Sequence, residues 1–305
     1  MLGNYVIISD GSCDLPEELA KEKDIEVIPF YVAMDGDHYG KEGIDVGVRE
    51  FYQHMVDHPD IFPRSSMPSI EDYYNAFKAH AQASQPVICI CITTKFSGSA
   101  TAAENARGLV LEEYPDAKIT VIDSQINTVL QGLYVQEAAK LRDAGISYEE
   151  SVKILLDIRS SGRIFFTVGS VDYLRSGGRI GKVARVVGGI MKIRPIITLK
   201  EGEIFGSGIS RSRRKSIDKC VDLLRQYVKE FHVTKEEYVF DIGFGYDYEE
   251  AVKYQETLII MLKEEGIDLE KEDIKIYQIG SGIGVHTGPY PLGVAVLKRA
   301  IKQRS

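Results

Sequence analysis

Residues 87–99 of the chain, with the sequence VICICITTKFSGS, join an apolar run to a hydroxyl-rich loop and to the start of a helix. The run at 87–92 has the length and composition of a buried strand, and residues 99–113 are expected to form a helix. Similar runs predict further strands at 5–8, 25–32 and 118–122. Strands that alternate with helices predict an α/β fold with a mainly parallel sheet flanked by helices.

Helix signals separate these strands. Asp14 and Pro16 predict a helix that begins with an aspartate cap, and Ser69 predicts the start of another. Residues 128–144 are expected to form a helix that ends at Gly145, because glycine adopts the left-handed cap conformation without strain.

The pattern changes after residue 160. A strand at 164–168, a helix at 182–191 and a hairpin at 194–210 are expected first, followed by helices at 213–231 and 248–265 and strands at 238–242 and 274–279. This order predicts an α+β domain with a mixed sheet. Because a single core stops growing at about this length, we expect an amino-terminal domain at 1–160 and a carboxyl-terminal domain at 161–305.

The composition narrows the class of protein. No apolar run approaches the ~20 residues of a membrane span, and Asp10 follows the start too closely for a secretory signal, so we expect a cytoplasmic protein. The four cysteines form no C-x-x-C pair. We therefore expect buried thiols, with neither a disulfide framework nor a metal site.

Charge is distributed unevenly along the chain. The formal net charge of −8 argues against nucleic-acid binding. Residues 159–215 nevertheless hold 13 Lys and Arg against 3 Asp and Glu. Two interpretations stay open: a basic surface for an acidic partner or a phosphate group, and charges that are spread around the fold.

The loop at 93–99 is the strongest local candidate for a binding site. It leads into a helix amino terminus, whose unpaired N–H groups favour an anion. Gly98 allows close approach to the backbone, and Thr94 and Ser97 supply hydroxyl donors. The loop therefore predicts a site for one small carboxylate or phosphate, and the alternative is that Ser97 or Ser99 only caps the helix.

Two other loops are expected at the same edge of the sheet, where parallel sheets bind their ligands. The loop at 9–16 lacks the G-x-G-x-x-G of dinucleotide sites. We interpret its carboxylates, Asp10 and Asp14, as structural groups rather than metal ligands. In the loop at 64–69, Ser69 is the expected helix cap, and Ser65 has no assigned local role.

Hydrolase and zinc-protease patterns are not found. The chain has no G-x-S-x-G, and His54 and His58 lack the glutamate of a zinc-protease helix. The glycine-rich stretch at 280–289 departs from the dinucleotide pattern and is not clearly followed by a helix. Its His286 is either a proton-responsive donor to an anion or a hydrogen-bonded histidine packed in a loop.

Five segments, taken in order, resemble the DegV family, the fatty-acid-binding proteins that serve bacterial fatty acid kinase. The segments are residues 9–16, 65–69, 93–101, 175–180 and 286–289, and the resemblance spans nearly the whole chain. It implies two α/β domains with a long acyl chain in a tunnel between them.

The resemblance also implies roles for individual residues. Ser65, Ser97 and the Gly98 backbone match the contacts to the fatty-acid carboxylate, and His286 matches a histidine near it. Thr94, from the same loop, is a further candidate donor.

The implied partner is the catalytic subunit of the kinase. Arg179, Arg211 and Arg213 resemble the surface that engages it, in agreement with the basic segment at 159–215. Three residues depart from the family pattern: Met67 replaces the usual Gln, Ser65 replaces the usual Thr, and Tyr290 replaces a Gly. We expect the changes at Met67 and Ser65 to alter chain preference or affinity, and Tyr290 to narrow the adjacent backbone path.

The function implied by the resemblance is non-catalytic. The protein would bind a long-chain fatty acid, without a cofactor, and present it to the kinase for acyl phosphate formation, with no nucleic-acid partner and at most transient membrane contact. Two other classes stay open. One is an enzyme that acts on a small carboxylated or phosphorylated metabolite, with Asp10 or His286 as base. The other is a DNA-binding regulator, which the net charge of −8 disfavours.

Overall fold

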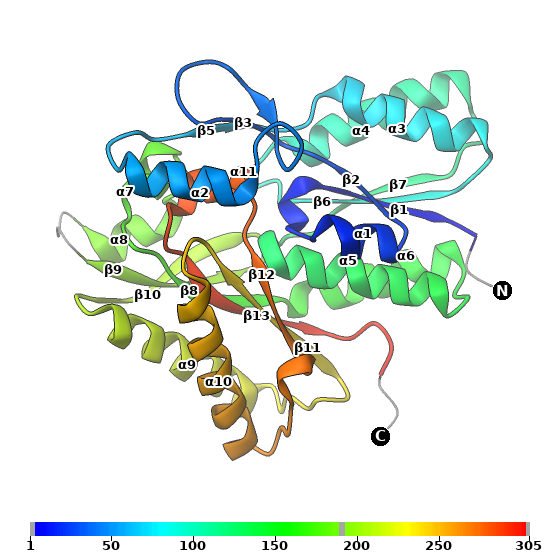
Figure 1. The fold of residues 1–305 in the computed structure, drawn as a ribbon. Helices are drawn as coiled ribbons and strands as arrows, with labels where there is room; N and C mark the ends of the chain where they lie inside the picture. The colour runs from blue at the N-terminus through cyan, green and yellow to red at the C-terminus, as the bar shows by residue number, and fades with distance from the viewer. Residues whose placement is uncertain (1–3, 189–192, 303–305) are drawn as a thin grey trace.

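The computed structural model describes residues 4–188 and 193–302. Its first sheet is parallel throughout, with the strand order β2-β1-β6-β7. The strands are β1 (Val6–Asp10), β2 (Ile25–Ile28), β6 (Val87–Cys91) and β7 (Ile119–Asp123). The predicted α/β fold with a parallel sheet is therefore confirmed (Figure 1).

Helices cover both faces of this sheet. One face packs against α3 (Ile70–Gln82) and α4 (Ser99–Glu113). The other packs against α1 (Glu17–Glu22), α5 (Thr128–Asp143) and α6 (Tyr148–Ile158). The strand alternation in β6 sends Cys89 and Cys91 toward α3 and α4, where both thiols are fully buried. All four cysteines are free and buried, as predicted.

The second sheet has six strands and is mixed, with the order β10-β9-β8-β13-β11-β12. Only β11 and β12 run parallel; the other neighbours are antiparallel. The strands are β8 (Arg163–Thr167), β9 (Arg194–Lys200), β10 (Glu203–Ser210), β11 (Tyr238–Phe244), β12 (Ile274–Gln278) and β13 (Leu292–Lys298). Its outer face packs against α9 (Arg213–Glu230) and α10 (Tyr248–Glu264), and its inner face packs against α5 (Figure 1).

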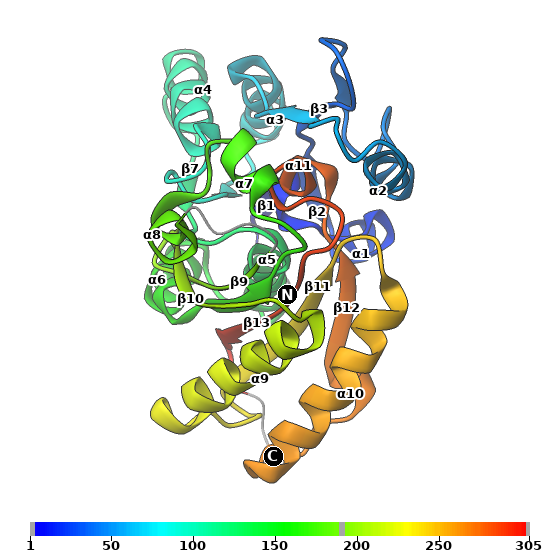
Figure 2. The same cartoon turned by 90° about the vertical axis from the view of Figure 1, so that its left-hand side faces the viewer.

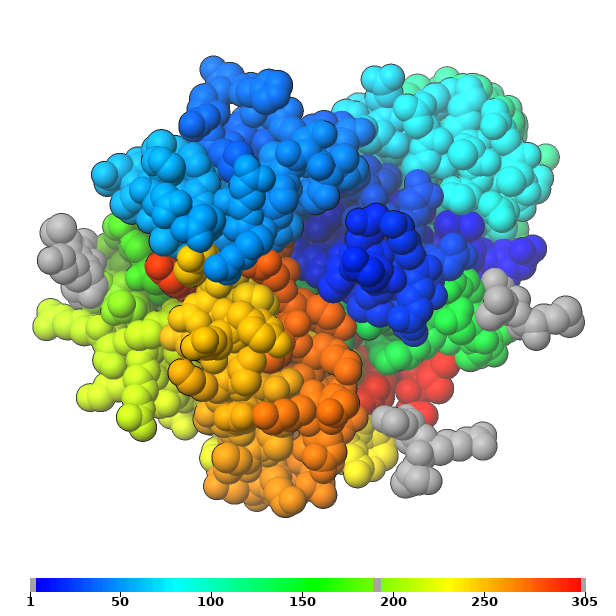
Figure 3. Space-filling model, viewed as in Figure 1, coloured from blue at the N-terminus to red at the C-terminus, as the bar shows by residue number. Residues whose placement is uncertain are grey.

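A small third sheet covers one side of the molecule. It consists of β3 (Tyr31–Ala33) between β4 (Gly40–Lys41) and β5 (Arg64–Ser66), and α2 (Val48–Asp57) lies beside it. Together they pack over α11 (Ser281–Thr287) and α7 (Asp172–Ser176) (Figure 2). In the space-filling view, the α2 segment covers this side above α10 (Figure 3). Arg49 of α2 holds it there by donating to the Tyr246 carbonyl at 2.6 Å.

The strand expected at 25–32 is divided between two sheets. β2 ends at Ile28 and pairs with β1, whereas β3 begins at Tyr31 and pairs with β4 and β5. Pro29 lies between them, and it has no N–H with which to continue a ladder.

The boundaries predicted for the helix at 182–191 are wrong. A 3-10 turn at Gly181–Val183 leads into α8 (Ala184–Val187), and Gly188 then adopts a φ of 55°, which ends the helix. Residues 189–191 of the expected helix lie outside the described residues.

Two elements differ from the expectations near the carboxyl end. The glycine-rich stretch begins directly with helix α11, and β13 occupies a segment to which the sequence pattern assigned no strand. Glycine costs about 1 kcal/mol in a helix interior. Helix propensity therefore does not predict α11, which contains two glycines. Packing explains the glycine at 284, because an added methyl there would lie 2.7 Å from the ring of Phe51.

The helix cap expected at Asp14 is also wrong. Pro16 is the residue before α1, and Asp14 turns to the start of α5, where its carboxylate accepts a hydrogen bond from Thr128. The division into domains at 160 and 161 stays a prediction. Among the described helices, none is both long and apolar enough to cross a membrane.

Candidate functional site

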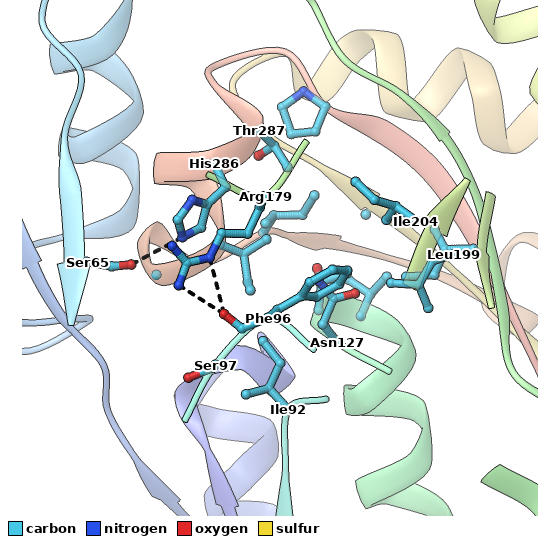
Figure 4. Close-up of a pocket in the computed structure, with 18 of the residues that line it drawn as sticks. Ser65, Ile92, Phe96, Ser97, Asn127, Arg179, Leu199, Ile204, His286 and Thr287 are labelled. Atoms are coloured by element: carbon cyan, nitrogen blue, oxygen red, sulfur yellow. Dashed lines mark hydrogen bonds between the residues drawn. The ribbon is translucent and has the colours of Figure 1, made fainter. Parts of the chain in front are cut away.

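A cavity of ≈ 280 Å³ lies between the two large sheets, and both halves of the chain contribute to its wall. The apolar part is built from side chains of both halves: Phe30, Ile92, Phe96, Val129, Ile164, Phe166, Leu174, Leu199, Ile204, Ile279, Ile283 and Leu292. The polar part includes Ser65, Ser66, Ser97, Gly98, Arg179 and His286. Figure 4 shows Ser65, Arg179 and His286 together at one end, with Leu199 and Ile204 at the other.

Ser97 and Gly98 line the cavity because the loop that follows β6 forms part of its wall. Ile92 lies in the wall, and the next residues turn so that Phe96, Ser97 and Gly98 line the cavity before α4 begins. The Ser97 hydroxyl oxygen accepts a hydrogen bond from the Ser99 N–H at 3.2 Å. Its own proton is therefore available to a ligand oxygen.

Ser65 faces this loop from the small covering sheet. It lies on β5, where it pairs with Val32, and its hydroxyl is 3.5 Å from Nε2 of His286. Met67 follows in the same wall and packs directly over Gly98: an added methyl at residue 98 would lie 2.9 Å from the Met67 sulfur. The structure thus places Ser65, Ser97, Gly98 and His286 in the wall of one cavity, and their contact with a carboxylate stays a prediction.

His286 is a neutral imidazole at neutral pH. It lies in the last turn of α11, not in a loop as one alternative had it. Burial lowers its pKa to about 4, and the nearby charge of Arg179 contributes in the same direction. The ring lies so close to α7 that any side chain at Gly177 would overlap Nδ1.

Arg179 is part of the cavity wall as well as of the surface. Its guanidinium donates to the Phe96 carbonyl from Nε at 3.2 Å and from Nη2 at 3.0 Å, and it also donates to the Gly177 carbonyl at 2.6 Å. It therefore ties the loop after β6 to the segment after α7. An outer groove shares Phe96, Ser97, Gly98, Arg179 and Ile204 with the cavity. Phe96, Ser97 and Arg179 therefore lie between the groove and the polar end of the cavity.

The structure does not bring Thr94 into the cavity. Its hydroxyl donates to the Asp123 carboxylate at 2.6 Å and lies in the outer groove. Since a hydroxyl has one proton, Thr94 has none left to donate to a ligand while this bond exists.

The three arginines that resemble a docking surface are not gathered at one place. Arg179 lies beside the start of β10, at Ile204, whereas Arg211 and Arg213 follow the end of that strand. Strand rise places them roughly 20 Å apart. Arg213 forms an ion pair with Glu250 at 2.6 Å, and Arg211 is exposed.

The carboxylates of the first loop do not line the cavity. Asp10 is fully buried and accepts hydrogen bonds from Ser12, Ser99, Gln131 and the Ile92 N–H, which agrees with a structural role. It is therefore not placed as a base for a ligand in the cavity.

Of the three departures from the family pattern, Ser65 and Met67 line the cavity and Tyr290 does not. Met67 lines the cavity, so its replacement of Gln removes a polar group from the wall. Tyr290 is not among the described lining residues; it packs on Gly169 and near Tyr246.

Sequence reasoning missed much of the wall. It gave Arg179 a role on the surface only and named none of the apolar lining residues. The contact between Arg179 and Phe96 joins positions 83 residues apart and depends wholly on the tertiary fold. Two polar lining residues that it missed, Ser66 and Thr287, stand next to the predicted Ser65 and His286.

Comparisons with known proteins agree with this architecture. A family model described as "Uncharacterised protein, DegV family" matches residues 4–299. A DegV domain-containing protein of Clostridium perfringens is 33% identical over 301 residues, covering 96% of this chain and 99% of the relative.

Solved structures show the same fold. A stearic acid-binding protein from Eubacterium ventriosum is 40% identical, with a TM-score of 0.91 over 97% of this chain and 99% of that one. DegV from Bacillus subtilis, a fatty acid binding protein, has a TM-score of 0.80 at 23% identity and covers the same shares.

The geometry predicts how His286 titrates. Replacing Arg179 by Gln should raise the pKa of His286 from about 4, because the imidazolium would lose a neighbouring positive charge. It should stay below the ordinary value of 6.5, since burial is the larger cause. NMR titration of the imidazole in protein freed of bound small molecules measures this. Arg214→Gln, at an exposed arginine of α9, should leave the titration unchanged. An unaltered His286 titration in Arg179→Gln would contradict the described geometry.

Proposed function

The chain belongs to the DegV family, and we propose that it binds one long-chain fatty acid in the cavity between its two large sheets. The observation that carries this proposal is the division of the wall into an apolar interior and one polar end with Ser65, Ser97 and His286. The stearic acid-binding relative, at 40% identity, supports this class of ligand.

The acyl chain supplies most of the affinity. Burial of sixteen methylenes at about 0.8 kcal/mol each would stabilise the complex by more than ~10 kcal/mol before the cost of association. A wall with Phe, Ile and Leu side chains from both halves removes those methylenes from water without offering them polar partners.

The carboxylate sets the orientation of the ligand. A carboxylate taken out of water needs hydrogen-bond donors. The Ser97 hydroxyl, the Ser65 hydroxyl and the Gly98 backbone surround the polar end, and the guanidinium of Arg179 supplies a positive charge at its rim. Neutral His286 adds one N–H donor.

Presentation to a kinase subunit is the further step of the proposal. The carboxylate would lie behind the thin wall formed by Phe96, Ser97 and Arg179, next to the outer groove. A partner that docks on this face would phosphorylate the carboxylate to an acyl phosphate, so that catalysis resides in the partner. Arg179, Arg211 and Arg213 would contribute to docking in the cytoplasm.

A small-metabolite enzyme fits the cavity less well. Most of the wall is apolar and offers a small polar substrate no partners. Asp10, one of the two bases considered for such an enzyme, is occupied by four hydrogen bonds outside the cavity.

The protein as purified from cells should carry one fatty acid per chain. The fatty acid remains bound because its dissociation would expose the buried methylenes to water. Denaturing extraction followed by mass spectrometry measures the content. Preparations that contain no lipid and also ignore added palmitate or oleate would refute fatty-acid binding.

Removing the hydroxyl of Ser97 or of Thr94 distinguishes a hydrogen bond to the ligand carboxylate from a hydrogen bond within the protein. Ser97→Ala should weaken fatty-acid binding by ~1–3 kcal/mol, because it removes a donor to a charged group. Thr94→Val should leave the affinity within about twofold of that of the unmodified protein, since the Thr94 hydroxyl is bonded to Asp123. Calorimetric titration with stearate measures both. Equal affinities of Ser97→Ala and the unmodified protein would place the carboxylate elsewhere.

Arg211 provides a test of docking that does not touch the cavity. Arg211→Ala should retain bound fatty acid but slow its phosphorylation when the protein is mixed with a fatty acid kinase catalytic subunit and ATP, because an exposed cation is lost from the contact surface. Lys229→Ala, at the far end of α9, serves as the charge-matched control. If both variants are phosphorylated at the original rate, Arg211 has no part in docking.

A further inference from the structure

Two acidic side chains, the buried Asp14 and the partly buried Glu42, lie beside the fatty-acid cavity and belong to no part of the proposed binding reaction. Asp14 follows the 3-10 turn after β1, and Glu42 follows β4 of the small covering sheet. Both face the beginning of α11, which comes from the other end of the chain.

Glu42 holds the first turn of α11 directly. Its Oε1 accepts hydrogen bonds from the Gly282 N–H at 2.7 Å and from the Ser281 hydroxyl at 3.1 Å. Asp14 lies against the same turn of α11. An added methyl at Gly280 would lie closer than 3 Å to both Asp14 Oδ1 and Glu42 Oε1. The two carboxyl groups therefore crowd one point.

Asp14 uses Oδ2 for the hydrogen bond from Thr128, and Glu42 uses Oε1 for α11. Among the described residues, Asp14 Oδ1, Glu42 Oε2 and the nearby Tyr52 hydroxyl are buried and form no hydrogen bond of ordinary geometry. The Gly280 N–H lies close enough to Asp14 to lower the pKa of its carboxyl group. Within residues 4–188 and 193–302, neither carboxylate forms an ion pair with a cation. Two adjacent buried negative charges without a cation would repel each other strongly.

We propose that Asp14 and Glu42 share one proton and together act as positioning residues that hold α11, and with it the wall of the fatty-acid cavity, in place. A single proton removes one of the two negative charges and gives the pair a hydrogen-bond donor, which two ionised carboxylates lack. The inference rests on the proposed function of the cavity, and it adds a dependence on pH to that function.

The helix connects the pair to the cavity. Gly282, whose N–H donates to Glu42, lies in the cavity wall, as do Ile283, His286 and Thr287 of the same helix. When the pair loses its proton, repulsion acts on the turn that positions these residues. Release of the fatty acid is then faster at higher pH.

The direction of the pH effect follows from the pKa values. Burial raises the pKa of Glu42 to about 7, and burial together with the charge of Glu42 raises that of Asp14 well above its usual range. A carboxyl group whose pKa is higher in the closed form than in an open form favours the closed form at low pH, and this preference is lost as pH rises through about 7.

Asp10 and Tyr52 are the other ionisable groups beside the pair, and His286 lies on the same helix, α11. Asp10 lies nearby with its pKa raised by burial, and the pKa of Tyr52 is raised well above its usual value by burial and by the two carboxyl groups. The pKa of His286, about 4, keeps it neutral between pH 6 and 8.

The test compares release of bound fatty acid between pH 6 and 8. In the unmodified protein the dissociation rate should rise by about three- to tenfold, within the one-proton limit of tenfold per pH unit. Glu42→Gln and Asp14→Asn, which imitate the protonated pair, should each change by less than about twofold. Asp35→Asn, an exposed residue in the loop that precedes Glu42, should retain the full pH dependence.

A second measurement does not require any lipid. The infrared band of a protonated carboxylic acid should be present at pH 6, decrease by pH 8, and be absent or altered in Glu42→Gln. Fatty acid that binds with the same pH dependence in the unmodified protein, Glu42→Gln and Asp14→Asn would overturn the inference while leaving the proposed function intact. A protein that binds no fatty acid but shows the titrating band would instead refute the proposed function alone.

Discussion

The carboxylate of Asp10 is the constraint on which the site depends. It lies at the end of β1 and accepts hydrogen bonds from the Ser12 hydroxyl at 2.6 Å, the Gln131 amide at 2.8 Å, the Ile92 N–H at 2.9 Å and the Ser99 hydroxyl at 2.6 Å. These donors come from the first loop, α5, the end of β6 and the start of α4. A buried carboxylate is tolerated only when its lone pairs are satisfied in this way. Because Ile92 and Ser99 flank the loop, their bonds to Asp10 fix the path on which Ser97 meets the cavity.

Local patterns in the sequence were sufficient for the parallel sheet and for Ser97 and Gly98 in the cavity wall, whereas Ser65 and His286 came from the resemblance and Arg179 from the structure. The apolar run before Thr93 and the serine-glycine step at 97–98 are contiguous signals, and the structure places Ser97 and Gly98 in the cavity wall. The sequence also predicted the hairpin at 194–210 correctly from its turn residues. Glu201 and Gly202 form a tight turn, and both adopt a positive φ. Where one short segment carries both the strand or turn signal and the chemistry, sequence reasoning succeeds.

The remainder depends on contacts between distant segments. β13 lies at the centre of the six-stranded sheet, between β8 and β11, yet its sequence LGVAVLK is short and contains a glycine. That glycine is dictated by a neighbour, because a methyl at 293 would lie 2.7 Å from the Phe165 carbonyl oxygen. Asp14 matched a helix-cap pattern, but Thr128 in α5 provided a better partner. In each case the decisive atom belongs to a residue far away in sequence.

The position of α5 limits how the protein can admit a ligand. One continuous apolar cluster extends from Ile7 and Ile90 of the parallel sheet, through Leu130 and Leu133 of α5, to Leu297 of the mixed sheet. A motion that separated the two sheets would expose this cluster to water, at a free-energy cost of roughly 25 cal/mol for each Å² of apolar surface. Because α5 joins the two large sheets through this cluster, we expect the sheets to stay together when a ligand enters the cavity. A ligand of the kind proposed would then enter and leave while this apolar core stays intact.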